Sequence, residues 1–247
     1  MSVLTSEAVV LRTWPLRESD LIISLFTRDF GRIKGVAKSA LKSRRRFGGA
    51  LETMTETRAW FVERPRQELV RLDQLELVRS PLSRTVDPVR MTVLSFYAEV
   101  LDESLPERDP QEAAFRLLVS VLEQTTVDQA WMPLTYFSLW ITRLMGLLPD
   151  LTRCMTCGEP LKADEISFNA LNDGLFCDIH RNGNASRLAP ESWRLAQRML
   201  RAPVAAFAAE PWSRRTAQDL RRFTLQALER QIEKKLRTAE ALARLGG

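Results

Sequence analysis

The chain is poor in sulfur and histidine, with three cysteines and a single histidine among 247 residues. A secreted disulfide framework would need more cysteines in pairs, so this count indicates a reducing compartment, and we expect a cytoplasmic protein. The N-terminus shows no basic segment followed by a long apolar stretch, and we therefore expect no signal peptide. The most apolar stretch, residues 130–148, includes Pro133 and Arg143, which favours a buried core helix over a membrane span.

The net charge of +5 is modest, but it is unevenly distributed. Residues 1–50 carry ten basic and four acidic side chains, and residues 191–247 carry twelve and six, whereas the middle of the chain is acidic. Residues 32–47 contain seven cations and no acid. So dense a run of like charges repels itself unless an anion shares the site, which favours a nucleic-acid partner over a merely solvated loop.

The first 80 residues consist of short β-rich runs separated by turn residues. These runs cover residues 7–14, 21–27, 32–37, 51–62 and 68–78. Five short strands in so short a segment are typical of a small closed barrel, most commonly of the OB fold. An SH3-like barrel is the alternative that the pattern leaves open.

Beyond Pro81, apolar residues recur at three- and four-residue spacing, which predicts helices and hence an α+β fold class. The last helix is expected to be long and amphipathic, with an apolar stripe from Leu220 to Leu242. Its opposite face carries basic residues that could hold another nucleic-acid strand or an acidic protein tail: Arg221, Arg222, Arg230, Lys234 and Lys235.

All three cysteines and the only histidine lie within one short segment. Cys154 and Cys157 form a C-x-x-C pair followed by Gly158, and Cys177 and His180 form a C-x-x-H pair. Ligands two residues apart let one tight turn aim both at a metal, and zinc prefers such a tetrahedral set of sulfur and nitrogen donors. We therefore predict one zinc ion per chain. Four protein ligands leave no position for a catalytic water, so the zinc is expected to be structural.

No enzymatic motif accompanies this site. With the histidine committed to metal, no serine–histidine or cysteine–histidine pair is available, and the phosphate loops G-x-x-x-x-G-K-[ST] and G-x-G-x-x-G are absent. A ligase would need a K-x-D-G motif, which is also missing. An acidic group could hold magnesium in a nuclease, but a solvated helix end is favoured for Asp102, Glu103, Glu107 and Asp109. We expect no catalytic residues and no enzyme.

The basic run is the expected nucleic-acid-binding site. A basic groove on a barrel face, with aromatic residues on which bases stack, is typical of single-strand-binding proteins. Trp14 and Trp60 are further stacking candidates, although a core position is favoured for Trp60. RNA binding by an OB barrel with a zinc ribbon is the alternative function, because basic residues do not distinguish RNA from DNA. The predicted site comprises Arg32, Lys34, Lys38, Lys42, Arg44, Arg45 and Arg46, with Phe47 as the stacking residue.

Several motifs together point to one family. They are Arg17-Glu18-Ser19-Asp20 followed by residues 21–27, Gly31, residues 35–38 before residues 43–47, the knuckle at residues 154–158, and residues 173–177. In order and length they cover essentially the whole chain, which resembles the bacterial DNA repair protein RecO family of recombination mediators. Members with this knuckle usually have cysteine as the fourth ligand, and this chain departs from that pattern at His180.

The resemblance implies an OB barrel in residues 1–80, a helical domain in residues 81–150 and 188–247, and an inserted zinc-finger module in residues 151–187. It also implies a role in DNA damage repair and recombination through binding of single- and double-stranded DNA and annealing of complementary strands. The implied partners are RecR and single-stranded-DNA-binding protein, with which the chain would load the recombinase RecA. By the same implication, the protein is associated with the nucleoid and not with a membrane.

Overall fold

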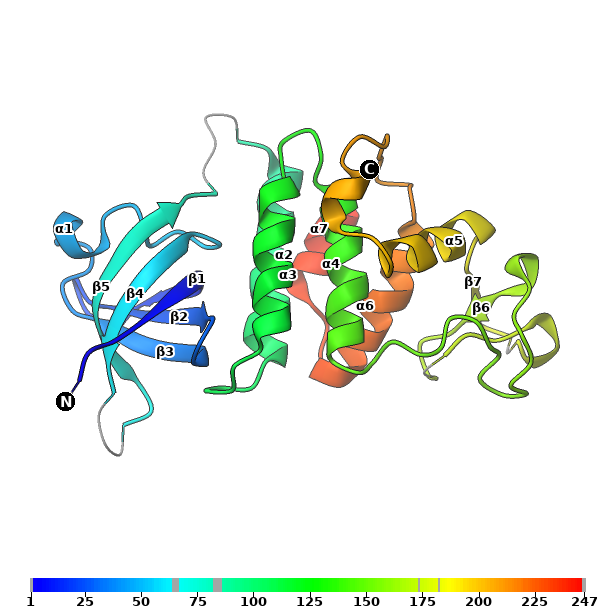
Figure 1. Ribbon diagram of the computed structural model, residues 1–247, viewed down its shortest axis with the longest axis horizontal. Coiled ribbons are helices and arrows are strands. Elements are labelled where there is room, and N and C mark those ends of the chain that lie inside the picture. Colours follow the sequence, from blue (N-terminus) through cyan, green and yellow to red (C-terminus); the bar gives the residue numbers. More distant parts are fainter. Residues whose placement is uncertain (1, 64–66, 82–85, 173, 182, 246–247) are drawn as a thin grey trace. The chain divides into compact units, whose positions relative to one another are not determined.

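The structure is a computed structural model that describes residues 2–63, 67–81, 86–172, 174–181 and 183–245. The chain divides into two compact units, Met1–Arg116 and Leu117–Gly247. The first unit contains a β-barrel and helix α2, and the second contains helices and the cysteine-rich module (Figure 1). The finer division at residues 80, 150 and 187 stays a prediction.

Five strands form a closed barrel in the order β1-β2-β3-β5-β4. Neighbouring strands are antiparallel except for β3 and β5, which run parallel. This is an OB-like barrel, so the predicted fold is confirmed over the SH3-like alternative. The strands are β1 (Leu4–Pro15), β2 (Leu21–Thr27), β3 (Gly31–Ala37), β4 (Glu56–Val62) and β5 (Val70–Arg79), and the short helix α1 (Arg44–Phe47) connects β3 to β4 (Figure 1).

Alternation along β3 directs its side chains to opposite sides of the barrel wall. Ile33 and Ala37 lie in the barrel core, whereas Arg32 and Lys34 occupy the outer face. Strand β2 differs because it is buried on both sides. On its outer side the ring of Phe26 meets the edge of Phe115, with ring centroids 5.5 Å apart. The outer surface of β2 is therefore covered by the chain's own residues.

Helix α2 (Pro88–Ser104) packs against β1 and β2. Its N-cap is Asp87, whose carboxylate accepts a hydrogen bond from the Arg90 backbone N–H at 2.6 Å, and Pro88 occupies the first helical position. The apolar stripe predicted for this helix is buried, but Glu99 and Asp102 are buried as well. A buried carboxylate needs a partner, and the partners of Asp102 come from the barrel wall.

The second unit is built around α4 (Trp131–Leu144) and α6 (Gln218–Ile232), which pack against each other, and α5 (Pro190–Met199) packs on α6. Most of α4 is buried, as predicted for a core helix. None of the described helices is both long and apolar enough to cross a bilayer. The remaining elements are α3 (Glu112–Gln124), α7 (Arg237–Arg244), the strands β6 (Ser167–Phe168) and β7 (Ser186–Arg187), and the 3-10 helices η1 (Ala163–Glu165), η2 (Asp178–His180) and η3 (Val204–Phe207).

The prediction of one long C-terminal helix is wrong, because the helix is interrupted at Glu233. This residue is left-handed, with φ 58°, and its backbone N–H donates to the carbonyl of Arg230. The carboxylate of Glu229 then accepts hydrogen bonds from the Leu236 N–H at 3.1 Å and from the Lys235 ammonium at 2.5 Å. These contacts close α6 and start α7, so the two halves of the predicted stripe belong to different helices.

Candidate metal centre and nucleic-acid interface

The two predicted ligand pairs meet in the module between α4 and α5. Cys154 and Cys157 lie on a tight turn, closed by a hydrogen bond of 2.9 Å from the Gly158 N–H to the Cys154 carbonyl. Gly158 has φ +72°, a conformation that glycine adopts without strain. Cys177 immediately precedes η2, and His180 ends it. The four ligand atoms all lie within 4.8 Å of one another, so they could hold a metal ion.

Backbone pairing brings the two arms of the cluster together. The Met155 N–H donates to the Leu175 carbonyl at 2.9 Å, which links the first knuckle to the segment before the second. Phe168 attaches the module to α6 through an edge-on contact with Phe223, with ring centroids 5.3 Å apart. Asp173, the first residue of the family motif at residues 173–177, lies outside the described residues. So small a module has little core of its own, which is the setting in which a metal stabilises most.

The two thiols of the first knuckle have pKa values shifted in opposite directions. Burial raises the pKa of Cys154, but hydrogen bonds from the backbone N–H groups of Cys157, Cys177 and Thr156 lower it by more. The net result is a pKa below the ordinary value of a thiol, at about 6. The pKa of Cys157 is raised: the Glu159 backbone N–H lowers it, but desolvation and the neighbouring Cys154 together outweigh that effect. The lowered pKa of Cys154 favours the thiolate, the form in which cysteine ligates a metal. Three sulfur donors and one imidazole fit zinc.

Part of the basic run lies exposed where β3 leaves the barrel. Lys38 follows β3, Lys42 lies in the next turn, and Arg44 and Arg45 begin α1. The Leu41 N–H donates to the Ser19 carbonyl at 3.2 Å, which ties this segment to the β1–β2 turn containing Arg17. Within the described part of the chain, no ion pair joins these exposed side chains to a carboxylate. We call them the loop cations: Arg17, Lys38, Lys42, Arg44 and Arg45.

Two members of the predicted site, Phe47 and Arg46, contact the protein's own residues. Phe47 is fully buried in the barrel core, so its predicted role as a stacking residue is wrong. Arg46 braces the loop, because its guanidinium donates to the Lys38 carbonyl at 2.7 Å and to the Ser43 hydroxyl at 3.1 Å. It also lies over the Phe47 ring, 5.1 Å from the centroid. Trp14 and Trp60 are half-buried, so neither is a full core residue.

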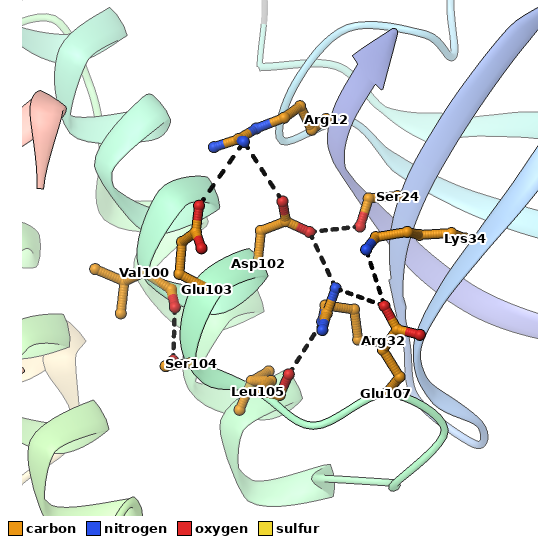
Figure 2. A network of polar contacts seen from close by, with 10 residues as sticks. All are labelled: Arg12, Ser24, Arg32, Lys34, Val100, Asp102, Glu103, Ser104, Leu105 and Glu107. Atoms are coloured by element: carbon orange, nitrogen blue, oxygen red, sulfur yellow. Dashed lines mark hydrogen bonds and ion pairs between the residues drawn. The ribbon is translucent and has the colours of Figure 1, made fainter. Parts of the chain in front are cut away.

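The other predicted cations, Arg32 and Lys34, are paired with the end of α2 (Figure 2). Arg32 lies 3.5 Å from the Asp102 carboxylate and 3.2 Å from that of Glu107, and its Nε donates to the Leu105 carbonyl at 3.0 Å. Lys34 is 2.9 Å from Glu107. A role for Arg32 in binding phosphate is therefore wrong, because its side chain is only 11% exposed.

The same network contradicts the prediction that Asp102 and Glu103 belong to a solvated helix end. Asp102 is buried, accepts a hydrogen bond of 2.7 Å from the Ser24 hydroxyl of β2, and lies 3.7 Å from Arg12 of β1. Glu103 lies 3.9 Å from the same arginine. Figure 2 shows these acids on α2 and on the segment after it, facing the barrel strands. Asp102, Glu103 and Glu107 each face a cation, whereas Asp109 is exposed and accepts a hydrogen bond of 2.8 Å from the Gln111 side chain. The three paired acids argue against a cluster of carboxylates free to hold magnesium.

An open groove adjoins the loop cations. Its volume is about 510 Å³, and Lys38 is its exposed cation at the β3 end. The groove lies where β3 and β5 run parallel, with Val36 on one side and Val70 on the other. Sequence reasoning missed it because the two walls are distant in the chain. The only sequence signal was the pair of β-rich runs themselves.

The second predicted basic face does not form as a continuous surface. Arg221 is largely buried, and its guanidinium donates to the Thr135 hydroxyl at 2.8 Å and to the Thr216 carbonyl at 2.7 Å. Burial lowers its pKa to about 10. Arg230 donates to the Ala170 carbonyl at 3.0 Å, and Lys235, in the segment between α6 and α7, pairs with Glu229 of α6. A DNA-binding role for Arg221 is therefore wrong; Arg222 and Lys234 are exposed.

Family comparisons cover nearly the whole chain. The family described as "Recombination protein O N terminal" matches residues 1–81, and "Recombination protein O C terminal" matches residues 86–240. The chain belongs to the recombination protein O family. This confirms the predicted family and makes the chain a DNA repair and recombination protein. Members of the family are non-enzymatic recombination mediators, so the expectation that the chain is not an enzyme is also confirmed.

Curated relatives agree along their full length. A DNA repair protein RecO of Koribacter versatilis (strain Ellin345) is 52% identical over 240 residues, covering 97% of this chain and 98% of the relative. A DNA repair protein RecO of Anaeromyxobacter sp. (strain K) is 31% identical over 241 residues, covering 96% and 95%. A third, from Syntrophotalea carbinolica, is 28% identical over 248 residues, covering 98% and 94%.

Proposed function

We propose that this chain binds single- and double-stranded DNA through the loop cations and anneals complementary strands. The observation that carries the proposal is the exposure of these cations at one edge of the barrel, without carboxylate partners in the described residues. Contacts between lysine or arginine and phosphate neutralise the backbone without reading sequence, so base edges stay free to pair. Two anionic strands can then approach each other on one surface.

The adjoining groove supports the same path. It starts at Lys38 and follows β3 and β5 past Val70, so a strand held by the loop cations has a surface on which to continue. Its lining combines apolar side chains, which suit contacts with bases or sugars, with polar and charged ones: Val36, Leu69 and Val70 with Lys38, Gln67, Glu68 and Arg71. We propose this groove as the binding surface in place of the outer face of β1 and β2, because α2 covers that face.

We further propose that the metal ion is zinc, one per chain, with a structural role. Cys154, Cys157, Cys177 and His180 would hold it and thereby join the two arms of the module. The proposed partners follow from the family: RecR, single-stranded-DNA-binding protein and the RecA loading pathway. Work on chromosomal DNA would place the protein at the nucleoid in the cytoplasm.

A strand-annealing assay tests the proposal. Two complementary DNA oligonucleotides, labelled with a fluorescence donor and acceptor, are mixed with the protein, with unlabelled RNA as competitor. Wild-type protein should accelerate annealing, and Lys42→Ala/Arg44→Ala/Arg45→Ala should lose most of that acceleration. The slope of the logarithm of single-strand affinity against the logarithm of salt concentration should become less steep by about two, since each of the three lost phosphate contacts removes about 0.7 from it.

The matched control removes three exposed cations from the second unit: Arg194→Ala/Arg201→Ala/Arg222→Ala. Its net charge equals that of the loop variant, so a general loss of positive charge affects both proteins alike. If the control loses annealing while the loop variant keeps it, the barrel edge is not the DNA site. Equal competition by RNA would show that the chain does not select DNA.

A further inference from the structure

The paired cations of the barrel wall differ in how deeply they are enclosed. Arg32 and Asp102 form the inner pair, with side chains 11% and 7% exposed. Arg12 and Lys34 flank this pair, and their side chains are 39% and 35% exposed. The inner pair is sealed from solvent, whereas a phosphate could reach the two outer cations.

The acids opposite these outer cations are also accessible. Glu103, facing Arg12, is 26% exposed, and Glu107, facing Lys34, is 44% exposed. The hydrogen bond from Lys34 lowers the pKa of Glu107, and the nearby positive charges of Lys34, Arg32 and Arg108 lower it further against a smaller effect of desolvation. Glu107 is therefore negatively charged at neutral pH and neutralises Lys34.

The backbone keeps Glu107 in place. The Arg108 N–H donates to the Arg32 carbonyl at 2.9 Å, directly beside Glu107. A Cβ atom on Gly31 would lie 2.2 Å from the Asp109 carbonyl oxygen, so the segment after α2 lies directly against β3. The carboxylates are thus held against the strands even when an anion competes for the cations.

We propose that Glu103 and Glu107 act as intramolecular competitors of the nucleic-acid backbone. Glu107 occupies Lys34, and Glu103 shares Arg12 with Asp102, so that two cations able to bind phosphate are neutralised and DNA is confined to the loop cations. Exposed ion pairs contribute little to stability, because solvent and salt screen them. Each phosphate contact, in contrast, steepens the salt dependence of single-strand affinity by about 0.7. The acids therefore affect DNA binding more than folding, and they keep binding reversible, as a protein that releases annealed strands requires.

This inference rests on the proposed function, and one binding experiment separates the two. The affinity of a fluorescein-labelled oligo(dT) is measured against salt for wild-type protein and for Glu103→Gln/Glu107→Gln. The variant should bind with a salt slope steeper by about 0.7, because Lys34 is released to neutralise one further phosphate while Asp102 still pairs with Arg12, and about fivefold more tightly at moderate salt. The matched control, Glu76→Gln/Glu112→Gln, removes two exposed acids of the same unit that pair with no cation in the described residues.

A second variant identifies the cation responsible. Lys34→Ala should leave the slope of the wild-type protein unchanged, because Glu107 already neutralises Lys34, but it should remove most of the gain in the Glu103→Gln/Glu107→Gln background. Circular dichroism and thermal melting verify that each variant is folded. The inference is overturned if the double variant matches its control, or if Lys34→Ala flattens the wild-type slope. Wild-type binding tests the proposed function by itself, and absence of binding by every protein overturns both.

Discussion

Arg32 and Arg44 belong to the same run of basic residues, yet they lie in opposite surroundings. Arg32 points from strand β3 to Asp102 on helix α2 and to Glu107 on the segment after it, and these carboxylates neutralise its charge within the fold. Arg44 lies exposed at the start of α1, where no described carboxylate pairs with it. The difference teaches that local charge density marks a region, whereas distant acids decide which of its cations can bind a ligand. The proposed structural role of the candidate metal cluster places it with Arg32, among the residues that stabilise the fold.

The largest effect that can test this separation comes from the metal cluster. Cys157→Ser should reduce the zinc content below the expected value of about one ion per chain. It should also lower the free energy of unfolding of the second unit by on the order of 5 kcal/mol, because the binding energy of the metal in small zinc modules contributes directly to folding. Single-strand binding at low temperature should change less than about twofold, because the loop cations belong to the other unit. Elemental analysis, thermal melting and fluorescence anisotropy measure the three quantities.

Thr156→Ser is the control in the same turn, because it leaves every ligand in place. Zinc content equal to wild type in Cys157→Ser would remove that residue from the ligand set. A loss of DNA binding in step with the loss of zinc would show that the module takes part in binding and would break the comparison.

A smaller effect separates the two arginines themselves. Arg32→Ala leaves the buried carboxylate of Asp102 without its nearest cation, which should cost about 3 kcal/mol of unfolding free energy. Arg44→Ala should change stability by less than about 0.5 kcal/mol, because it is a surface substitution. Urea unfolding, monitored by circular dichroism at neutral pH, measures both. Equal destabilisation of the two variants would contradict the assignment of Arg32 to the fold.

The smallest effect concerns the outer pair of Lys34 and Glu107. A carboxyl group whose pKa is lowered in the folded state stabilises the protein above its ordinary pKa, and this contribution is lost as the pH falls through the lowered value. Glu107→Gln should therefore reduce stability by about 0.5 kcal/mol at neutral pH, since the pair is exposed and screened. The difference from wild type should vanish in strong acid. Glu76→Gln, an exposed acid of the same unit, should show no such pH dependence, and a constant difference for Glu107→Gln would point to lost packing instead.

Much of the fold followed from local patterns. The run at residues 21–27 matches β2, and the count of five strands was sufficient to predict an OB-like barrel. The start of β4 was missed by several residues, because Met54 adopts φ 65° in a turn that the apolar pattern does not reveal. The helix break at Glu233 was missed for the same reason: a left-handed residue other than glycine leaves no signature in hydrophobic spacing.

The candidate metal cluster was predictable and the nucleic-acid interface only partly so. Cys154 and Cys157 lie two residues apart, and a short turn suffices to aim both at one point, so spacing alone carried the prediction. Phe47 shows the contrast, because its basic neighbours suggested exposure while α1 turns its ring into the barrel core. Arg221 was likewise placed on a surface by helical periodicity, although Trp131 and Thr135 of α4 cover it.

The sequence by itself determined the β-rich first 80 residues, the ligand spacing of the metal cluster and the position of the basic run, because each is written in neighbouring residues. Only the tertiary structure decided that Arg32 and Lys34 are neutralised while Lys42 and Arg44 are not. Their carboxylate partners arrive on a helix far along the chain, and a charge is available to a ligand only when no closer anion of the same molecule occupies it.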